Sequence, residues 1–199
     1  MHTPDPSVER VTSTPARGWA VLLLFRAQGS SVILVSYTFG LFLPFIRDDL
    51  DISLLQAGLL QGVWWVTAAT FALPFSAWLS RFRPVPVVLL SLILALPFLF
   101  MQAVATSFSF LILTRFCFVL FHVMATPGRT LLLQQWAAPR QYAQINSVGL
   151  SQHSVILALA VSTSALFITV VGSWRIAYLL IGGLLLAQAI AWCWWHRSE

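Results

Sequence analysis

The amino-acid sequence predicts an all-α membrane protein with six transmembrane helices, arranged as two inverted three-helix repeats. Hydrophobic residues make up 59% of the chain and charged residues only 9%, with a mean hydropathy of +0.85, whereas soluble domains carry about 25% charged residues. Short polar breaks divide the chain into six apolar stretches, each close to or above the roughly 20 residues that cross the hydrocarbon core. Shifting residues 18–105 by 89 positions, onto the second half of the chain, places Arg26 on Arg115. This weak similarity falls where membrane proteins built from inverted repeats would have it.

The elements follow from the polar breaks. Residues 1–17 contain three prolines and mixed charge, which predicts a disordered tail, and residues 18–199 predict one six-helix bundle. The next stretch is longer than the roughly 7–15 apolar residues of a signal peptide and contains Arg26, so it predicts an uncleaved span. The breaks are short, and consecutive helices should therefore be antiparallel neighbours. The predicted spans are about 18–46, 54–79, 85–105, 108–136, 142–171 and 174–195.

The distribution of arginine predicts the orientation in the membrane. Loops that stay in the cytoplasm are enriched in lysine and arginine. If the amino terminus is inside, the outer loops contain only Arg47 and Arg175. The cytoplasmic segments then contain Arg10, Arg17, Arg81, Arg83, Arg140 and Arg197. We therefore expect both termini in the cytoplasm, with the bacterial cytoplasmic membrane as the location.

Four stretches resemble a known family. They read GLFLPFIRDDLDISLLQAGLLQGVWW, PFSAWLSRFRP, LTRFCFVLF and VVGSWRIAYLLIGGLLLAQAIAW. In the last, Gly172, Trp174 and Arg175 match a Gly-x-Trp-Arg entry to a sixth helix. Together with the loop lengths, the chain over residues 18–195 resembles the amino-terminal half of a major facilitator superfamily transporter.

The resemblance implies a secondary active transporter that moves a small-molecule substrate across the cytoplasmic membrane by alternating access. A complete transporter of this family has two six-helix halves around a central pathway. We therefore expect a second six-helix half, or a second copy in a homodimer, as a partner alongside the lipid bilayer. The alternative from another class is a truncated or non-transporting six-helix membrane subunit that acts as a scaffold.

Two family signatures are matched only in part. The second-loop signature implies a gating role for Arg81 and Arg83, but the acidic residue of that signature is missing because Ser76, Ser80 and Phe82 fill the neighbouring positions. In the fourth span Arg115 matches the arginine of proton-coupled antiporters. Phe118 and Val119 stand where that signature has glutamine and glycine. Antiport by that signature is therefore not supported.

Arg115, His122 and Arg129 are seven residues apart in the predicted fourth span. Seven residues of an α-helix turn by about 700°, so the three side chains share one face. Charged residues inside a membrane almost always face the bundle interior or a water-filled cavity. Arg26 and Gln28 in the first span, and Gln152 and His153 in the fifth, lie at a depth comparable to that of Arg129.

These residues predict a positively charged substrate site, because no acidic residue lies inside a predicted span. Arginine presents a fork of donors that matches a carboxylate or an inorganic oxyanion, so we expect an organic or inorganic anion. The expected binding residues are Arg26, Gln28, Arg115, His122, Arg129 and Gln152. The alternative is structural: the fourth-span arginines could bond backbone carbonyls at a broken helix near Pro127 and Gly128, or reach the interfaces. His122 could then be a packing residue. Trp64, Trp65 and Gln61 either border the site or fill the bundle.

Other functional classes are not supported by the sequence. No nucleophile with a neighbouring base and no carboxylate pair occurs in or near the spans, so we expect neither an enzyme nor a cofactor. His122 and His153 lack a third ligand for a metal ion. The arginines are scattered rather than clustered on one basic face, which argues against nucleic-acid binding.

Overall fold

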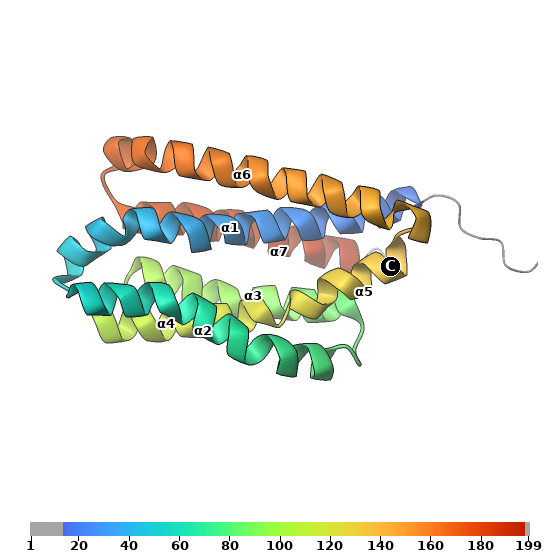
Figure 1. The fold of residues 1–199 in the computed structure, drawn as a ribbon, viewed down its shortest axis with the longest axis horizontal. Helices are drawn as coiled ribbons and strands as arrows, with labels where there is room; N and C mark the ends of the chain where they lie inside the picture. The colour runs from blue at the N-terminus through green and yellow to red at the C-terminus, as the bar shows by residue number, and fades with distance from the viewer. Residues whose placement is uncertain (1–13, 198–199) are drawn as a thin grey trace, which may run out of the picture.

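The computed structural model describes residues 14–197, with a few side chains inside this range left out; most of the predicted tail, residues 1–13, lies outside the described part. Helices joined by short turns make up this range (Figure 1), and six spans are long and apolar enough to cross a membrane. The predicted all-α, six-helix class is confirmed. The elements are α1 (Ala16–Leu50), α2 (Leu54–Leu79), α3 (Pro84–Ala103), α4 (Phe108–Val123), α5 (Thr126–Trp136), the 3-10 turn η1 (Pro139–Gln141), α6 (Tyr142–Val171) and α7 (Trp174–Arg197).

The span predicted at 108–136 consists of two helices rather than one. Between α4 and α5 the amides of Ala125 and Gly128 donate to the carbonyls of His122 and Ala125, three residues back, at 3.0 Å each. Pro127 lies in the first turn of α5, where its missing amide hydrogen costs nothing. Arg129 is thus on a different helix from Arg115 and His122, and the seven-residue register does not continue through the break.

The packing repeats between the two halves of the chain. α1 packs against α6 and α7, and α4 packs against α2 and α3 in the same way. Exchanging the first three spans for the last three reproduces these contacts, while α3 and α7 pack against each other. α1 and α4 run in opposite directions through the bundle (Figure 1), as members of an inverted repeat should.

A polar cluster fastens one end of the bundle. Arg175, at the start of α7, donates from Nη1 to the carbonyls of Ala103 at 3.2 Å and Ala105 at 2.6 Å. Its Nη2 lies 2.6 Å from Oδ2 of Asp49 at the end of α1. The indole of Trp174 also donates to this oxygen, at 3.2 Å. The cluster therefore joins α1, α3 and α7.

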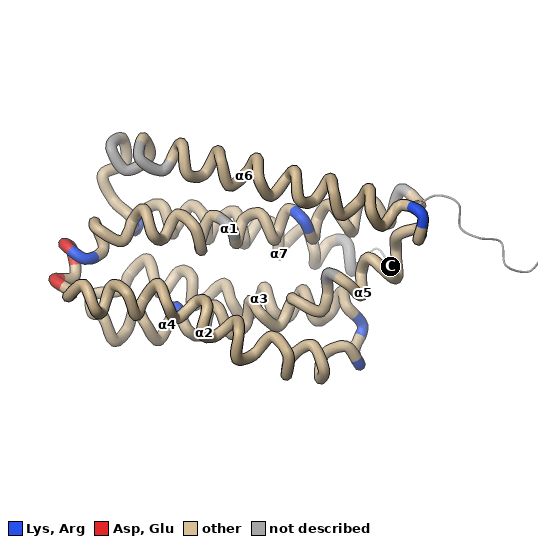
Figure 2. The backbone as a smooth tube through the Cα atoms, viewed as in Figure 1, with Lys and Arg blue, Asp and Glu red and all other residues tan. Residues whose placement is uncertain are grey.

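Charge is separated between the two ends of the bundle (Figure 2). The acidic residues that the structure describes lie at the α1–α2 end, close to the start of α7. At the opposite end, where α1 begins and α7 ends, the α2–α3 turn and η1 carry exposed arginines and no acid among the described residues. These arginines are Arg81, Arg83 and Arg140.

We predict that Arg175→Met lowers the stability of the protein. The change removes one ion pair and two hydrogen bonds from a charged donor. Such bonds contribute about 1.5–3 kcal/mol each to stability. Because Arg175 is partly exposed, we expect the loss in the free energy of unfolding to lie toward the lower end of that range. Thermal unfolding in detergent measures it. The matched control is Arg47→Met, because Arg47 pairs only with its exposed neighbour Asp48 among the residues described. Equal unfolding temperatures for the two variants would contradict the prediction.

Candidate functional site

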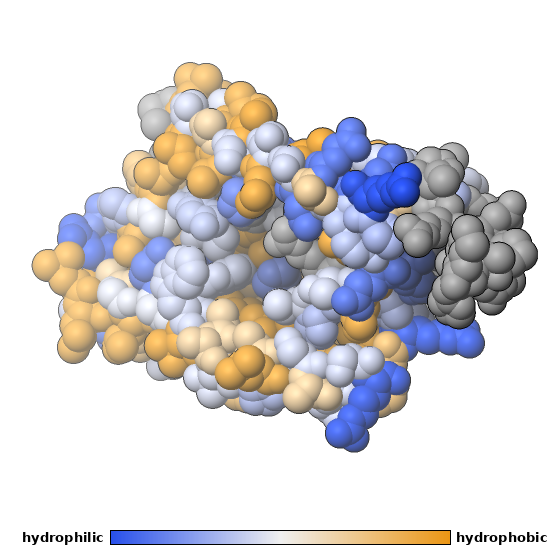
Figure 3. Space-filling view, turned by 45° about the vertical axis from the view of Figure 1, so that its right-hand side comes forward, coloured by the Kyte–Doolittle hydropathy of each residue, from blue (hydrophilic) through white to orange (hydrophobic). Residues whose placement is uncertain are grey.

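A cavity of about 300 Å³ lies between the first, second, fourth and fifth spans. Figure 3 shows the hollow on this face of the molecule, between α6 at the top and α2 at the bottom. The lining includes one guanidinium and two imidazoles but no carboxylate. Its residues are Phe25, Arg26, Gly29, Ser30, Val32, Ser36 and Tyr37 of α1, Trp64 and Trp65 of α2, His122 of α4, and Gly149 and His153 of α6.

Arg26 is positioned in this cavity by α6. Its Nη2 donates to Oδ1 of Asn146 at 3.2 Å. The guanidinium passes over Gly149 so closely that a Cβ on this residue would lie 2.1 Å from Cζ of Arg26. Only glycine leaves room for the cation there. One helical turn along α1, the hydroxyl of Ser30 donates to the Arg26 carbonyl and accepts from Nε2 of Gln152 at 3.4 Å.

His122 forms the aromatic side of the cavity. Its ring stacks on Trp64, with 5.7 Å between centroids, and lies 6.4 Å from the ring of Phe118. His122 also lines an adjoining cavity of about 180 Å³ together with Gln28 and Thr126. Gln28 is buried, and its Oε1 has no hydrogen-bond partner among the described residues. This oxygen is an available acceptor beside the larger cavity.

Arg115, predicted as a binding residue, does not line either cavity. The side chain is fully buried. Its Nε donates to the Leu60 carbonyl at 2.9 Å, and its Cζ lies 3.4 Å from the centroid of the Phe39 ring. The two Nη atoms of Arg115 have no hydrogen-bond partner within the described part. Arg115 therefore joins α4 to α1 and α2, through a carbonyl that is far from Pro127 and Gly128 in the sequence.

The other predicted residues lie in different places. Gln152 touches the site only through Ser30 and does not line the cavity. Arg129 belongs to α5, but its side chain falls outside the described residues. Arg81 and Arg83 are exposed on the α2–α3 turn, at one end of the bundle rather than near the cavity.

Sequence reasoning did not single out several lining residues. On α1, Ser30 and Tyr37 follow Arg26 by four and eleven residues. On α6, Gly149 lies four residues before His153, which the sequence had indicated only by its depth. These intervals keep side chains on one face of a helix. Tyr37 and His153 meet edge to face with 6.2 Å between ring centroids. Helical spacing counted from Arg26 could have identified Tyr37, whereas the position of Gly149 depends on how α1 and α6 cross.

Comparison with known proteins gives the family. A family profile described as Major Facilitator Superfamily matches residues 28–199. The chain belongs to the major facilitator superfamily. No curated protein matched the sequence. The resemblance found in the sequence is confirmed, and this superfamily member is a multi-pass membrane protein of a class whose members are transporters rather than enzymes.

We predict that Gly149→Ala displaces Arg26 without unfolding the protein. The added methyl would clash with the far end of a flexible side chain, which can move, so the stability cost should stay below the roughly 1–3 kcal/mol of overpacking in a rigid core. Phenylglyoxal, which modifies accessible arginines, should react faster with Arg26 in the variant, as followed by mass spectrometry. Gly183→Ala on α7 is the control, because nothing lies within 4 Å of a Cβ there. An unchanged rate at Arg26 would contradict this geometry.

Proposed function

We propose that this superfamily member is one six-helix half of a secondary active transporter, and that its central cavity binds a small organic anion through Arg26. The observation that carries the proposal is the Arg26 guanidinium, held at the cavity wall by Asn146 and Gly149. Arginine is well suited to bidentate contact with a carboxylate or phosphate. The sequence supports a positively charged cavity, because none of its six acidic residues is among the residues that line it. The acidic residues are at positions 5, 9, 48, 49, 51 and 199.

The size and lining of the cavity support an organic anion over an inorganic one. A volume of about 300 Å³ is at the lower end of small-molecule pockets, which span roughly 300–1,000 Å³. Three aromatic side chains line the cavity together with Arg26, namely Trp64 and Trp65 of α2 and Tyr37 of α1. A ligand with an anionic group and a flat apolar body would satisfy both parts of the lining.

A second six-helix half is needed to complete a transport pathway. The cavity opens between α2 and α6, and both helices carry large exposed apolar side chains beside it, such as Trp65 and Val66 on α2 and Leu150 on α6. A facing half, from a second copy or a separate partner, would cover these surfaces and enclose the substrate. Rocking of the two halves about the site would then expose it to each side in turn.

The proposed orientation places the end with Arg81, Arg83 and Arg140 in the cytoplasm, because cytoplasmic loops retain basic residues. We predict that a cysteine at position 140, in a Cys117→Ala, Cys193→Ala background, reacts with an impermeant maleimide only after cells are permeabilised. Asp48→Cys in the same background is the control and should react in intact cells. Labelling at position 140 from outside would reverse the orientation.

We predict that Arg26→Gln greatly weakens anion binding. Truncating one side of a buried charge-assisted contact costs about 2–5 kcal/mol, and the partial exposure of Arg26 favours the lower value. Thermal shifts of the purified protein with benzoate, succinate and phosphate, compared with glucose and choline, first identify a stabilising probe. Titration of that probe then compares the variants. Arg26→Lys should bind with intermediate affinity, because lysine keeps the charge but lacks the planar fork.

The control for this experiment is Arg47→Gln, which removes an arginine from the acidic end of the bundle, far from the cavity lining. Unchanged affinity in Arg26→Gln, or stabilisation by choline and by none of the anions, would refute the anion site. Uptake into proteoliposomes tests transport separately. Binding without uptake, even as a dimer, would favour the alternative of a non-transporting subunit.

A further inference from the structure

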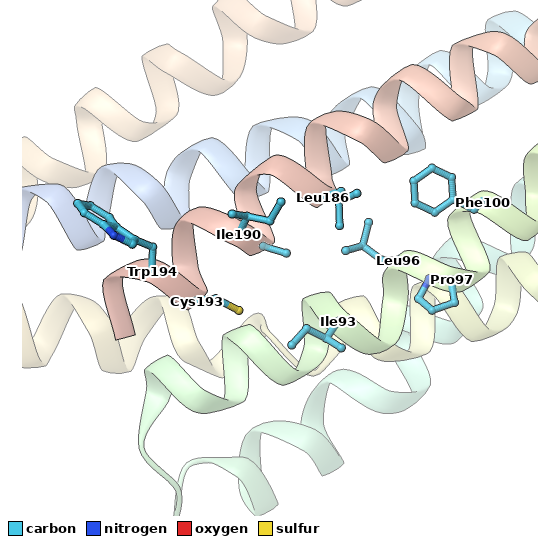
Figure 4. A pocket seen from close by; sticks show the side chains of 9 residues that line it. Ile93, Leu96, Pro97, Phe100, Leu186, Ile190, Cys193 and Trp194 are labelled. Carbon is cyan, nitrogen blue, oxygen red and sulfur yellow. The ribbon is translucent and has the colours of Figure 1, made fainter. Parts of the chain in front are cut away.

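A second cavity, separate from the central one, lies in a groove between α3 and α7. It has a volume of about 610 Å³, and Figure 4 shows side chains from both helices facing it. The lining is apolar apart from one cysteine: Ile93, Leu96, Pro97 and Phe100 from α3, and Leu186, Ala189, Ile190, Cys193 and Trp194 from α7. Neither helix contributes a residue to the lining of the central cavity.

An exposed apolar stripe on α3 continues from this groove toward one end of the bundle. Ile93 and Pro97 line the groove, and Leu90 and Pro86 precede them at helical intervals of three and four residues. All four are exposed, with Leu90 at 50% and Ile93 at 46%. Residues at such intervals share one face of a helix. The stripe begins three residues after Arg83, which precedes the first residue of α3.

The groove opens at the basic end of the bundle. Arg175, at the start of α7, contacts the carbonyl of Ala103 at the end of α3, so the end of α7 lies beside the start of α3. Trp194 lies three residues before the end of α7 and marks the mouth of the groove (Figure 4). Tryptophan at such a position is typical of the membrane interface. Arg81 and Arg83, both exposed, lie on the adjacent turn and have no ion pair with any residue in the described part.

The α7 residues that line the groove span slightly less than the hydrocarbon of one leaflet. Leu186 and Trp194 are eight residues apart on α7, which corresponds to about 12 Å of helix. One half of a hydrocarbon core is about 15 Å thick. On α3 the groove reaches Phe100, sixteen residues or about 24 Å from the start of that helix, so a chain that enters beside Trp194 would extend past the middle of the bilayer.

We propose that this groove binds one acyl chain of an anionic phospholipid, whose phosphate is held by Arg81 and Arg83. The apolar lining accepts the chain, the stripe on α3 guides it, and the two arginines supply the charge that selects the headgroup. An acyl chain is the occupant because the groove lies within the membrane-spanning part of α3 and α7. The charge at its mouth favours an anionic lipid over a zwitterionic one, since each basic residue near an anionic headgroup layer contributes about 1 kcal/mol.

Native mass spectrometry of the full chain in detergent, titrated with palmitoyl-oleoyl phosphatidylglycerol or the corresponding phosphatidylcholine, tests the proposal. The wild type should bind phosphatidylglycerol more tightly than phosphatidylcholine, on the order of tenfold given two arginines. The double variant Arg81→Gln, Arg83→Gln should bind both lipids equally. Arg140→Gln, which removes an exposed arginine at the same end but away from the groove, should keep the preference.

The chain site is tested by a change that fills the groove. Ile190→Trp adds bulk to a lining residue that is 62% exposed, and it should weaken binding of both lipids. Leu184→Trp on the same helix, exposed but outside the groove, should weaken neither. For the wild type, a higher salt concentration should remove the preference for phosphatidylglycerol without any substitution.

Each of three results would overturn the proposal. Equal affinity of the wild type for both lipids would remove the headgroup selection. An equal loss in Arg140→Gln would show that the preference reflects overall charge rather than this site. Unchanged binding in folded Ile190→Trp, with folding verified by circular dichroism, would show that the chain does not occupy the groove.

Discussion

The structure depends on one constraint: the hydrocarbon core offers no water to polar groups, so each must find its partner within the protein. Helices satisfy the hydrogen-bonding groups of the backbone, and this explains why the described part of the chain consists of helices joined by short turns. The side chains that remain polar gather on faces that helices turn toward each other. Gln188 of α7, for example, donates to the Ala27 carbonyl at 3.1 Å and to the Ser31 hydroxyl at 2.7 Å on α1.

The same constraint gives two arginines at comparable positions in the two repeats different roles. Arg115 has a carbonyl and an aromatic ring as neighbours and is closed off from any cavity. Arg26 has an amide oxygen and a glycine as neighbours and stays partly exposed. A side chain that is enclosed on all sides can hold helices together, whereas one with an open side can also meet a solute. The inverted repeat thus places two arginines at comparable positions, where one holds helices together and the other borders the cavity.

The sequence predicted the spans well because hydrophobic length alone identifies a membrane helix. It could not predict the break in the fourth span. Pro44, Pro74 and Pro97 lie inside continuous helices, whereas Pro127 lies at the start of a new one, and composition does not distinguish these cases. For the site, depth in the membrane was enough to indicate Arg26 and His122. The enclosure of Arg115 depends on where Leu60 and Phe39 fall on other helices, and the facing position of Gly149 depends on a helix crossing. Neither follows from the order of residues along one span.

The contact between Arg26 and Asn146 also bears on how the protein is made. The two residues are 120 positions apart in the chain, and synthesis adds about 5–20 residues per second. The first helix therefore exists for roughly 6–24 s before its partner on α6 has been made. During that interval a guanidinium in an isolated helix cannot rest in lipid without cost. Until then the insertion machinery, or water drawn in from the interface, must shelter the first helix. The contact between Arg26 and Asn146 can form only after the fifth span has been made, so this part of the site is completed late in synthesis.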